Sequence, residues 1–206
     1  DGMSVKGGLV PAKHGREQMP LKGKGFDRMD DEVTYTASMD GKIEMQNDRI
    51  VVLPVHEVSG NAELAEGNID FRGDIVIHGN VESGVNIRAT GSITIDGVAE
   101  ACMLEAGKDI ILRGGMLGGN KASVKTKGAI TAKFFEFTNI LCEGDLQADV
   151  LMDCSVICHG QIRLTGRKGS IIGGKVQAIR GLIATSLGND AEKRTEIFVG
   201  AGIDVY

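Results

Sequence analysis

The chain has 206 residues, of which 42% are hydrophobic and 25% charged, so it is long enough and apolar enough to bury a sizeable core. Its formal net charge of −5 argues against a general nucleic-acid binder and against a polybasic membrane anchor. Thirty glycines beside only three prolines exclude collagen and a Pro/Gly-rich disordered linker. No apolar run approaches the roughly 18 residues of a membrane-spanning helix. We therefore expect a soluble protein with no nucleic-acid partner and no direct membrane insertion.

Residues 1–66 are predicted to form a small all-β domain. Short β-forming runs occur at residues 33–36, 42–45 and 49–53, and Pro54 ends the strongest of them. Turn signals such as Asp40-Gly41 separate these runs. We expect this domain to pack on the domain that follows it or to cap its open end, because a terminal strand would otherwise expose unpaired backbone groups.

From residue 67 onward a unit recurs that consists of a glycine, one or two residues, an aliphatic residue, any residue, and a second aliphatic or small residue. Successive units are 16 to 21 residues apart. Their first aliphatic positions are Ile75, Ile93, Ile110, Ile130, Leu146, Ile162 and Ile183. Regular repetition of this kind is typical of solenoids.

Two further series stay in step with the first. A second strand is led by Ile87, Leu104, Val124, Ile140, Val156 and Val176. A third, looser stretch follows each unit at Val81, Val98, Met116, Phe134 or Phe135, and Val150. Three short strands with period-two alternation in each unit of about 18 residues predict a right-handed parallel β-helix of about seven coils over residues 67–206. A β-sandwich also has many short strands, but it does not require this fixed period.

Three of the four cysteines, Cys142, Cys154 and Cys158, are predicted to fill the core. Val156 points inward, so alternation also places Cys154 and Cys158 inward. Cys142 has the register of Cys158 in the neighbouring coil, so the two should stack. The alternative, a metal site or redox pair, is weaker because Cys154, Cys158 and His159 offer only three ligands at a spacing that no common zinc site uses.

Other motifs do not indicate catalysis. Residues 169–175 spell the start of a phosphate-binding loop, but Val176 stands where a serine or threonine is needed, and no helix is expected there. The four histidines have no nucleophile or carboxylate partner at motif spacing, so each is expected to be exposed or hydrogen-bonded. We expect no catalytic residue, no cofactor and no metal ligand.

Three stretches carry a resemblance to a known family: residues 7–25 with Asp40-Gly41, residues 50–79, and residues 104–115 with 166–175. In their order and spacing they resemble the flagellar assembly protein A (FapA-like) family, formerly a bacterial domain of unknown function. The resemblance implies a right-handed parallel β-helix behind a small β domain, in a cytoplasmic bacterial protein linked to flagellar assembly or placement without established catalysis. The β-helix is also similar to those of the bactofilins and of a cell-division inhibitor, an analogy of fold alone.

One basic segment is a candidate partner-binding site. Only Glu17 and Asp27 offset the five cations of residues 13–28, so the segment carries +3 in an acidic protein. These cations are Lys13, Arg16, Lys22, Lys24 and Arg28. The segment is either a solvated loop or a surface that attracts an acidic partner, because opposite charge steers association.

The leading hypothesis is a non-enzymatic scaffold or interaction protein. Its partners would be proteins, flagellar or signalling ones by the resemblance, and it would itself form a homo-oligomer because flat sides and open ends favour self-association. The alternative is a cytoskeletal or division-site protein that polymerises through its β-helix. An enzyme acting on a polysaccharide or a nucleotide is the third possibility.

Overall fold

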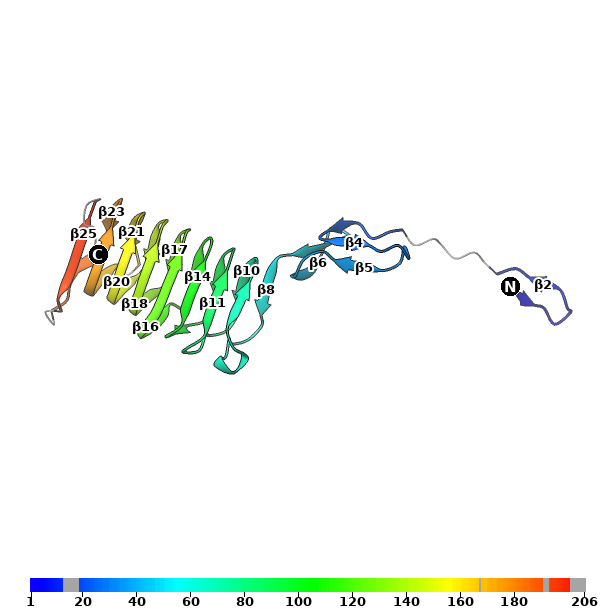
Figure 1. Ribbon diagram of the computed structural model, residues 1–206, viewed down its shortest axis with the longest axis horizontal. Coiled ribbons are helices and arrows are strands. Elements are labelled where there is room, and N and C mark those ends of the chain that lie inside the picture. The colour runs from blue at the N-terminus through cyan, green and yellow to red at the C-terminus, as the bar shows by residue number, and fades with distance from the viewer. Residues whose placement is uncertain (13–18, 167, 191–192, 201–206) are drawn as a thin grey trace. The chain divides into compact units, whose positions relative to one another are not determined.

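The computed structural model describes residues 1–12, 19–166, 168–190 and 193–200, and these are almost entirely β-structure. The chain forms two compact units. The N-terminal unit contains residues 1–39 and 43–52, and the second unit contains residues 40–42 and the chain from residue 53 onward. Figure 1 shows the long row of side-by-side strands, from β8 to β25, that makes up the second unit.

Three small sheets form the N-terminal unit. The strand pairs are β1 (Gly2–Met3) with β2 (Leu9–Val10), β4 (Phe26–Arg28) with β5 (Tyr35–Ala37), and a three-stranded sheet in which β7 (Arg49–Leu53) lies between β3 (Gly23–Lys24) and β6 (Lys42–Gln46). Asn47 and Asp48 both have left-handed backbone, with φ of 50° and 58°, as a tight two-residue hairpin turn requires. Among the described hydrophobic residues of this unit only Val52 is buried, so the unit has almost no core.

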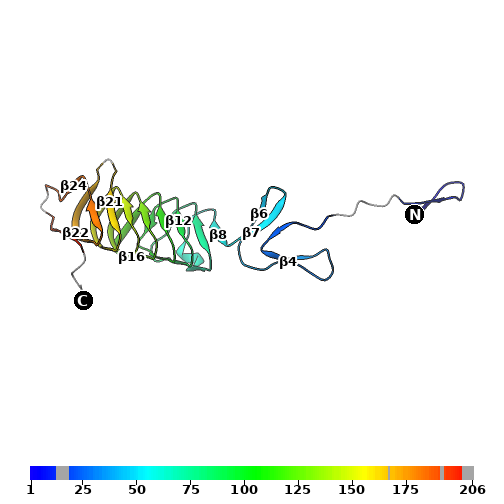
Figure 2. The ribbon, with the colours of Figure 1, turned by 90° about the horizontal axis from the view of Figure 1, so that it is seen from above.

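The second unit is a parallel β-solenoid of about eight turns, which confirms the predicted fold class. One sheet contains β8 (Val55–Val58), β10 (Asp74–Ile77), β12 (Ile93–Ile95), β15 (Ile110–Leu112), β17 (Ile130–Ala132), β19 (Leu146–Ala148), β21 (Gln161–Leu164) and β23 (Gly181–Ile183). The other contains β9 (Ile69–Phe71), β11 (Asn86–Ala89), β14 (Met103–Ala106), β16 (Met116–Thr126), β18 (Phe134–Cys142), β20 (Val150–Cys158), β22 (Ser170–Ala178) and β24 (Ser186–Leu187). Two strands lie off this path, β13 (Ala99–Glu100) against β16 and β25 (Thr195–Val199) against β22. Figure 2 shows the successive coils from above. A short 3-10 helix at Leu64–Glu66 is the helical element of the described residues.

The first aliphatic series forms a continuous stack in the core. Ile75, Ile93, Ile110, Ile130, Leu146 and Ile162 are register partners in successive strands, and all six are fully buried. The last predicted member is wrong by one residue. Leu182, not Ile183, pairs with Ile162, and Ile183 is 49% exposed. The final coil therefore runs from Ile162 to Leu182, and the strand alternation turns Ile183 outward.

The second series is also confirmed, from Ile87 through Val176, and continues to Ile69 at one end and Ile197 at the other. The third side of the coil differs from the expectation by one residue at two places, where Ala99 and Leu151 stand instead of Val98 and Val150, and Phe135 is the inward one of the two phenylalanines offered. Its inward residues are Ala62, Val81, Ala99, Met116, Phe135, Leu151 and Ile171. Val98, Phe134 and Val150 therefore lie beside the stack rather than in it.

The additional coil comes from residues that the sequence places in the preceding domain. Strand β8 pairs in parallel with β10, and His56 stands opposite Ile75. Because that register position holds a histidine instead of an aliphatic residue, the repeat is visible in the sequence only from the next coil onward. The solenoid thus includes residues 55–66, which lie before the expected boundary at residue 67.

An aspartate in every second coil caps a neighbouring backbone group. The Asp74 carboxylate accepts a hydrogen bond from the Ser92 amide at 2.7 Å, and Asp109 and Asp145 do the same for the amides of Ala129 and Gln161 at 2.7 and 2.8 Å. The intervening coils have Ser92, Ala129 and Gln161 at the same position. This corner of the solenoid therefore repeats every two coils, whereas the core stack repeats every coil.

Candidate functional site

The basic segment lies in the N-terminal unit, and the structure divides its five predicted residues. Lys13 and Arg16 lie outside the described residues. Lys22 directly precedes β3, where its carbonyl oxygen accepts a hydrogen bond from the Ile50 amide at 2.9 Å, and Lys24 ends that strand beside Val51. Both lysines are exposed.

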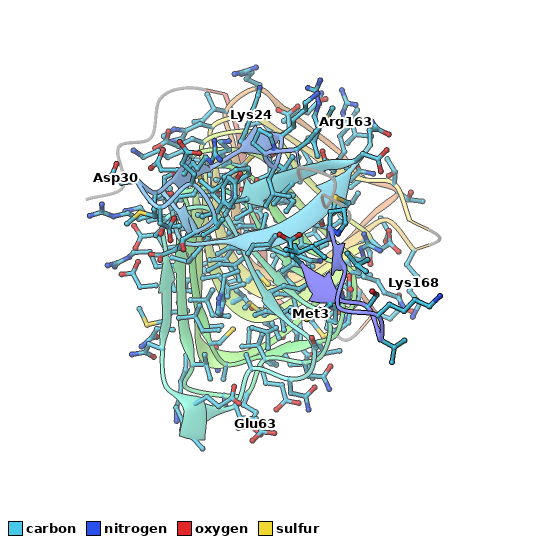
Figure 3. All side chains as sticks on the ribbon, turned by 90° about the vertical axis from the view of Figure 1, so that its right-hand side faces the viewer. Met3, Lys24, Asp30, Glu63, Arg163 and Lys168 are labelled. Carbon is cyan, nitrogen blue, oxygen red and sulfur yellow. The ribbon has the colours of Figure 1, made fainter. Side chains whose placement is uncertain are left out.

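Arg28 has a structural role in its own loop. Its Nε and Nη2 donate hydrogen bonds to the Glu32 carbonyl oxygen at 2.9 and 2.7 Å, and Nη2 lies 3.6 Å from the Glu32 carboxylate. Asp31 closes the same turn by accepting hydrogen bonds from Thr34 and Val33, and the Thr34 side chain above all lowers the pKa of that carboxyl. Arg28 is therefore already engaged, whereas Lys22 and Lys24 form no ion pair with any residue that the structure describes. The Lys24 side chain stands away from its strand (Figure 3).

Cys142, Cys154 and Cys158 lie in the core as predicted. Cys142 and Cys158 are register partners in β18 and β20, and all four thiols are buried. The Cys142 and Cys158 Sγ atoms lie 3.3 and 3.2 Å from the Gly144 carbonyl oxygen. Burial raises the pKa of Cys102 to about 12 and that of Cys154 to about 11, so both thiols stay protonated and unreactive near neutral pH. Nowhere in the described ranges do three His, Cys, Asp or Glu side chains gather as a metal site would require.

The glycine-rich segment at residues 169–175 is part of a solenoid strand. Strand β22 begins at Ser170, and Gly173 and Gly174 form a corner with φ of 70° and 79°. Lys175 lies over the Phe198 ring, with Nζ 5.3 Å from the ring centroid. The segment thus lacks the loop-to-helix geometry that cradles a phosphate.

An ion network that motif spacing does not reveal is centred on His78. Its Nδ1 lies 2.9 Å from Asp96 Oδ2 and its Nε2 lies 3.0 Å from Glu57 Oε1. Arg113 approaches Asp96 at 3.2 Å, and Lys42 pairs with Glu57. Hydrogen bonds to the two carboxylates raise the pKa of His78, and the bond to Asp96 has the larger effect. A signal is present in the sequence, since His78, Asp96 and Arg113 each follow the last inward residue of a strand in successive coils.

A shallow trough of about 400 Å³ lies on the exposed face of the sheet that contains β9, β11, β14 and β16. One side is a row of outward residues in register, Asp70, Arg88, Glu105 and Lys125, which we call the charge row. The other side is the row Asn68, Asn86, Met103 and Ser123. Within the charge row, Arg88 pairs with Glu105 at 3.0 Å and lies 4.0 Å from Asp70, while Lys125 pairs with no described residue.

A smaller apolar hollow of about 280 Å³ lies on the third side of the solenoid. Phe134, Val150, Met152 and Ile172 line it, with Lys168 and Glu136 among its polar residues. The Ser170 hydroxyl at this site is buried and has no hydrogen-bond partner among the described residues. No other feature of the described residues indicates which molecule or segment would bind in this hollow.

The comparison with protein families agrees with this architecture. The model of the flagellar assembly protein A β-solenoid domain matches residues 54–205, which begin where the solenoid unit begins. The chain belongs to the flagellar assembly protein A family. No curated protein and no solved structure matched the chain.

Membership of the flagellar assembly protein A family accounts for most of the chain, and residues 1–53 lie outside the matched domain. The basic segment therefore belongs to the unmatched part, whereas the charge row and the centre of the His78 network belong to the family's β-solenoid domain. In the described residues no helix is long and apolar enough to cross a membrane.

Proposed function

We propose that this member of the flagellar assembly protein A family is a non-enzymatic, cytoplasmic scaffold that acts in the assembly or placement of bacterial flagella through protein–protein contacts. The observation that carries the proposal is the solenoid itself, a continuous apolar core that holds rows of outward side chains at fixed spacing. Such a surface can position partners without chemistry, because a β-solenoid presents an extended and rigid face.

The surroundings of Cys102, Cys154 and His78 support a binding role over a catalytic one for these three side chains. The buried thiols of Cys102 and Cys154 are held protonated, and His78 is held between two carboxylates that favour its charged form. A general base or nucleophile needs the opposite, a neutral imidazole or a thiolate near neutral pH.

Lys22 and Lys24 are the proposed contacts to an acidic partner, flagellar or signalling in nature. They are exposed, close in sequence and without an ion pair to a described residue, whereas Arg28 is committed to Glu32. We further propose that the protein is a homo-oligomer. The alternative to a discrete homo-oligomer is end-to-end polymerisation into filaments. The observation that supports this alternative is that each solenoid sheet ends in a parallel strand edge that could pair with another chain.

Gene replacement in a flagellated cell that carries this protein tests the scaffold role. Deletion should reduce the number or misplace the position of flagella, counted by electron microscopy, and the unaltered chain should restore them. Lys22→Glu with Lys24→Glu should fail to restore them at normal protein level. The matched control reverses two other exposed cations of the same unit, Lys6→Glu with Arg49→Glu, and should restore flagella fully.

Normal flagella in the deletion strain would overturn the flagellar role. Restoration by the Lys22 and Lys24 variant would overturn the acidic-partner contact while leaving the scaffold role standing.

A further inference from the structure

We propose that the charge row, Asp70, Arg88, Glu105 and Lys125, is the contact between two copies of this chain, whose solenoid axes run antiparallel. The two copies meet face to face and are related by a twofold axis. This axis lies in the interface, is parallel to the strands, and passes between β11 and β14. The inference rests on the self-association proposed above and names its surface. It starts from the exposed face of one sheet, where the four side chains stand in register on adjacent strands.

The order of charges in the row makes it complementary to itself. Along the solenoid the row reads negative, positive, negative, positive. Reversed, the same row reads positive, negative, positive, negative. An antiparallel second copy therefore sets Asp70 against Lys125 and Arg88 against Glu105, each twice because a twofold contact is isologous.

Other arrangements of two copies lack this match. A parallel copy in register would place every charge opposite its own kind, which is destabilising. A shift of the antiparallel copy by one coil would bring Arg88 against Arg88 or Glu105 against Glu105. A parallel copy shifted by one coil, or an antiparallel copy shifted by two coils, would pair opposite charges over only part of the row. Among the registers that the spacing of about 4.8 Å between strands allows, the proposed one is the one that pairs all four charges of each copy.

The same pattern disfavours a partner of uniform charge. The row has no net charge, so a purely acidic or purely basic surface would meet repulsion at every second residue. A full match needs alternating charges at the strand spacing of a parallel sheet, and the chain itself carries such a row. The side chains are available, since those of Asp70 and Arg88 are 72% and 65% exposed.

The second row of the trough fits the same arrangement. The twofold axis keeps each position along the strands, so this row also meets its own reversed copy, and all its members are uncharged. Asn68 would face Ser123, and Asn86 would face Met103. Met103, which is 53% exposed, would come within one strand spacing of Met103 of the second copy and gain an apolar contact.

The arrangement brings like charges together at one flank. Arg72 and Lys127 are exposed, lie just beyond the ends of β9 and β16, and would face each other across the axis. Both side chains are long and lie at the rim, so their charged ends can turn into water and the repulsion is small. Lys125, which has no described partner within its own chain, would gain Asp70 of the second copy.

The test uses two single charge reversals of the whole chain, followed by sedimentation velocity over a range of concentrations. Arg88→Glu alone sets an acidic side chain against Glu105 of the second copy, and Glu105→Arg alone sets a basic one against Arg88. Each should weaken self-association at least about tenfold, because each changes two symmetric contacts. Circular dichroism establishes that both variants are folded.

Mixing the two variants is the decisive step. The first variant is acidic at positions 88 and 105, and the second is basic at both, so every antiparallel contact between the two variants is attractive. A heterodimer should therefore form although neither variant associates alone. Within each copy the pair between positions 88 and 105 stays broken, so rescue by mixing cannot arise from restored folding. Rescue of Arg88→Glu by the unaltered chain instead would indicate a parallel contact and would overturn the proposed geometry.

A third reversal checks the register at the flank. Lys127→Glu replaces the repulsion between Lys127 and Arg72 of the second copy by attraction, so it should tighten association. Weaker association of this variant would contradict the proposed register.

The control is Lys121→Glu, an exposed cation outside the charge row, which should leave association unchanged. If the unaltered chain associates and both reversals in the charge row associate equally well, the oligomer exists but uses another surface, and this inference fails alone. If the unaltered chain is monomeric at every concentration, the proposed self-association fails with it.

Discussion

At the scale of single residues, His78 is the side chain whose charge the structure specifies most closely. Both ring nitrogens lie within hydrogen-bond distance of carboxylate oxygens, which only accept hydrogen bonds. Only the doubly protonated imidazolium can donate to Asp96 and Glu57 at once. Lys42 and Arg113 complete a network in which cations and anions alternate.

This geometry predicts a pH dependence of stability. The pKa of His78 is raised in the folded state, so its contribution is fully present below the unfolded pKa and is lost as pH rises through the folded value. Between about pH 5.5 and about pH 8.5, the unfolding free energy from urea titrations should fall more for the unaltered chain than for His78→Gln. His159→Gln, a change to another exposed imidazole, should leave the difference between the two pH values intact. An identical pH response of the His78 variant would contradict the network.

At the scale of strands and corners, close stacking of glycines controls the distance between coils. A Cβ at Gly114 would lie 2.2 Å from the Gly97 carbonyl oxygen and 2.4 Å from its carbonyl carbon. Backbone atoms cannot move aside as the end of a side chain can. The next coil would have to shift, and the strand pairing on both sides of the corner would shift with it.

Gly114→Ala should therefore lower the unfolding free energy by about 1–3 kcal/mol, the usual range for overpacking at a tight site. Gly60→Ala is the matched control, because a Cβ at Gly60 has no atom within 4 Å and the backbone there is not left-handed. Chemical denaturation of both variants measures the difference. Equal stability of the two would show that the corners are looser than the structure indicates.

Periodicity is sufficient to predict the solenoid because burial alone determines it. The stacked aliphatic residues of the core must recur once per coil, and the sequence identifies them correctly from Ile75 to Ile162. The errors occur where local packing decides between neighbouring residues. Leu182 replaces Ile183, and Ala99 and Leu151 replace Val98 and Val150, because a shift of one residue exchanges the inward and outward faces of a strand.

The surface sites are harder to predict for a related reason. Arg88 and Glu105 are 17 residues apart in sequence and become neighbours only when the register of β11 and β14 is known. His78 meets Glu57 and Asp96 in the same way, across two different coils. The basic segment is visible because its residues are close in sequence, but sequence cannot show that Arg28 is occupied by Glu32.

At the scale of the whole molecule, the two units differ in how much core each has. The apolar cluster of the solenoid extends from Ala62 to Ala178, whereas Val52 is the buried hydrophobic residue among those described in the N-terminal unit. The solenoid should therefore hold its fold without the first 52 residues, since a unit with its own core can fold alone.

A chain shortened to residues 53–206 should retain a cooperative thermal transition within about 3 °C of the full chain. It loses the ion pair between Lys42 and Glu57, which is partly exposed and so contributes little. Residues 1–52 alone should show no cooperative transition, because they bury too little apolar surface. Loss of the transition in the shortened solenoid, followed by circular dichroism, would contradict this division.

The aspartates at one corner of the solenoid place a condition on how such a molecule can grow or shrink in evolution. Asp74, Asp109 and Asp145 each accept a hydrogen bond from a backbone amide of the next coil, and the coil after that carries the next aspartate or starts a new pair. Removal of a single coil would set two acceptors side by side or leave an amide without one. Removal or duplication of two adjacent coils would preserve every such bond. Descendants of this chain should therefore differ from it in length by an even number of coils.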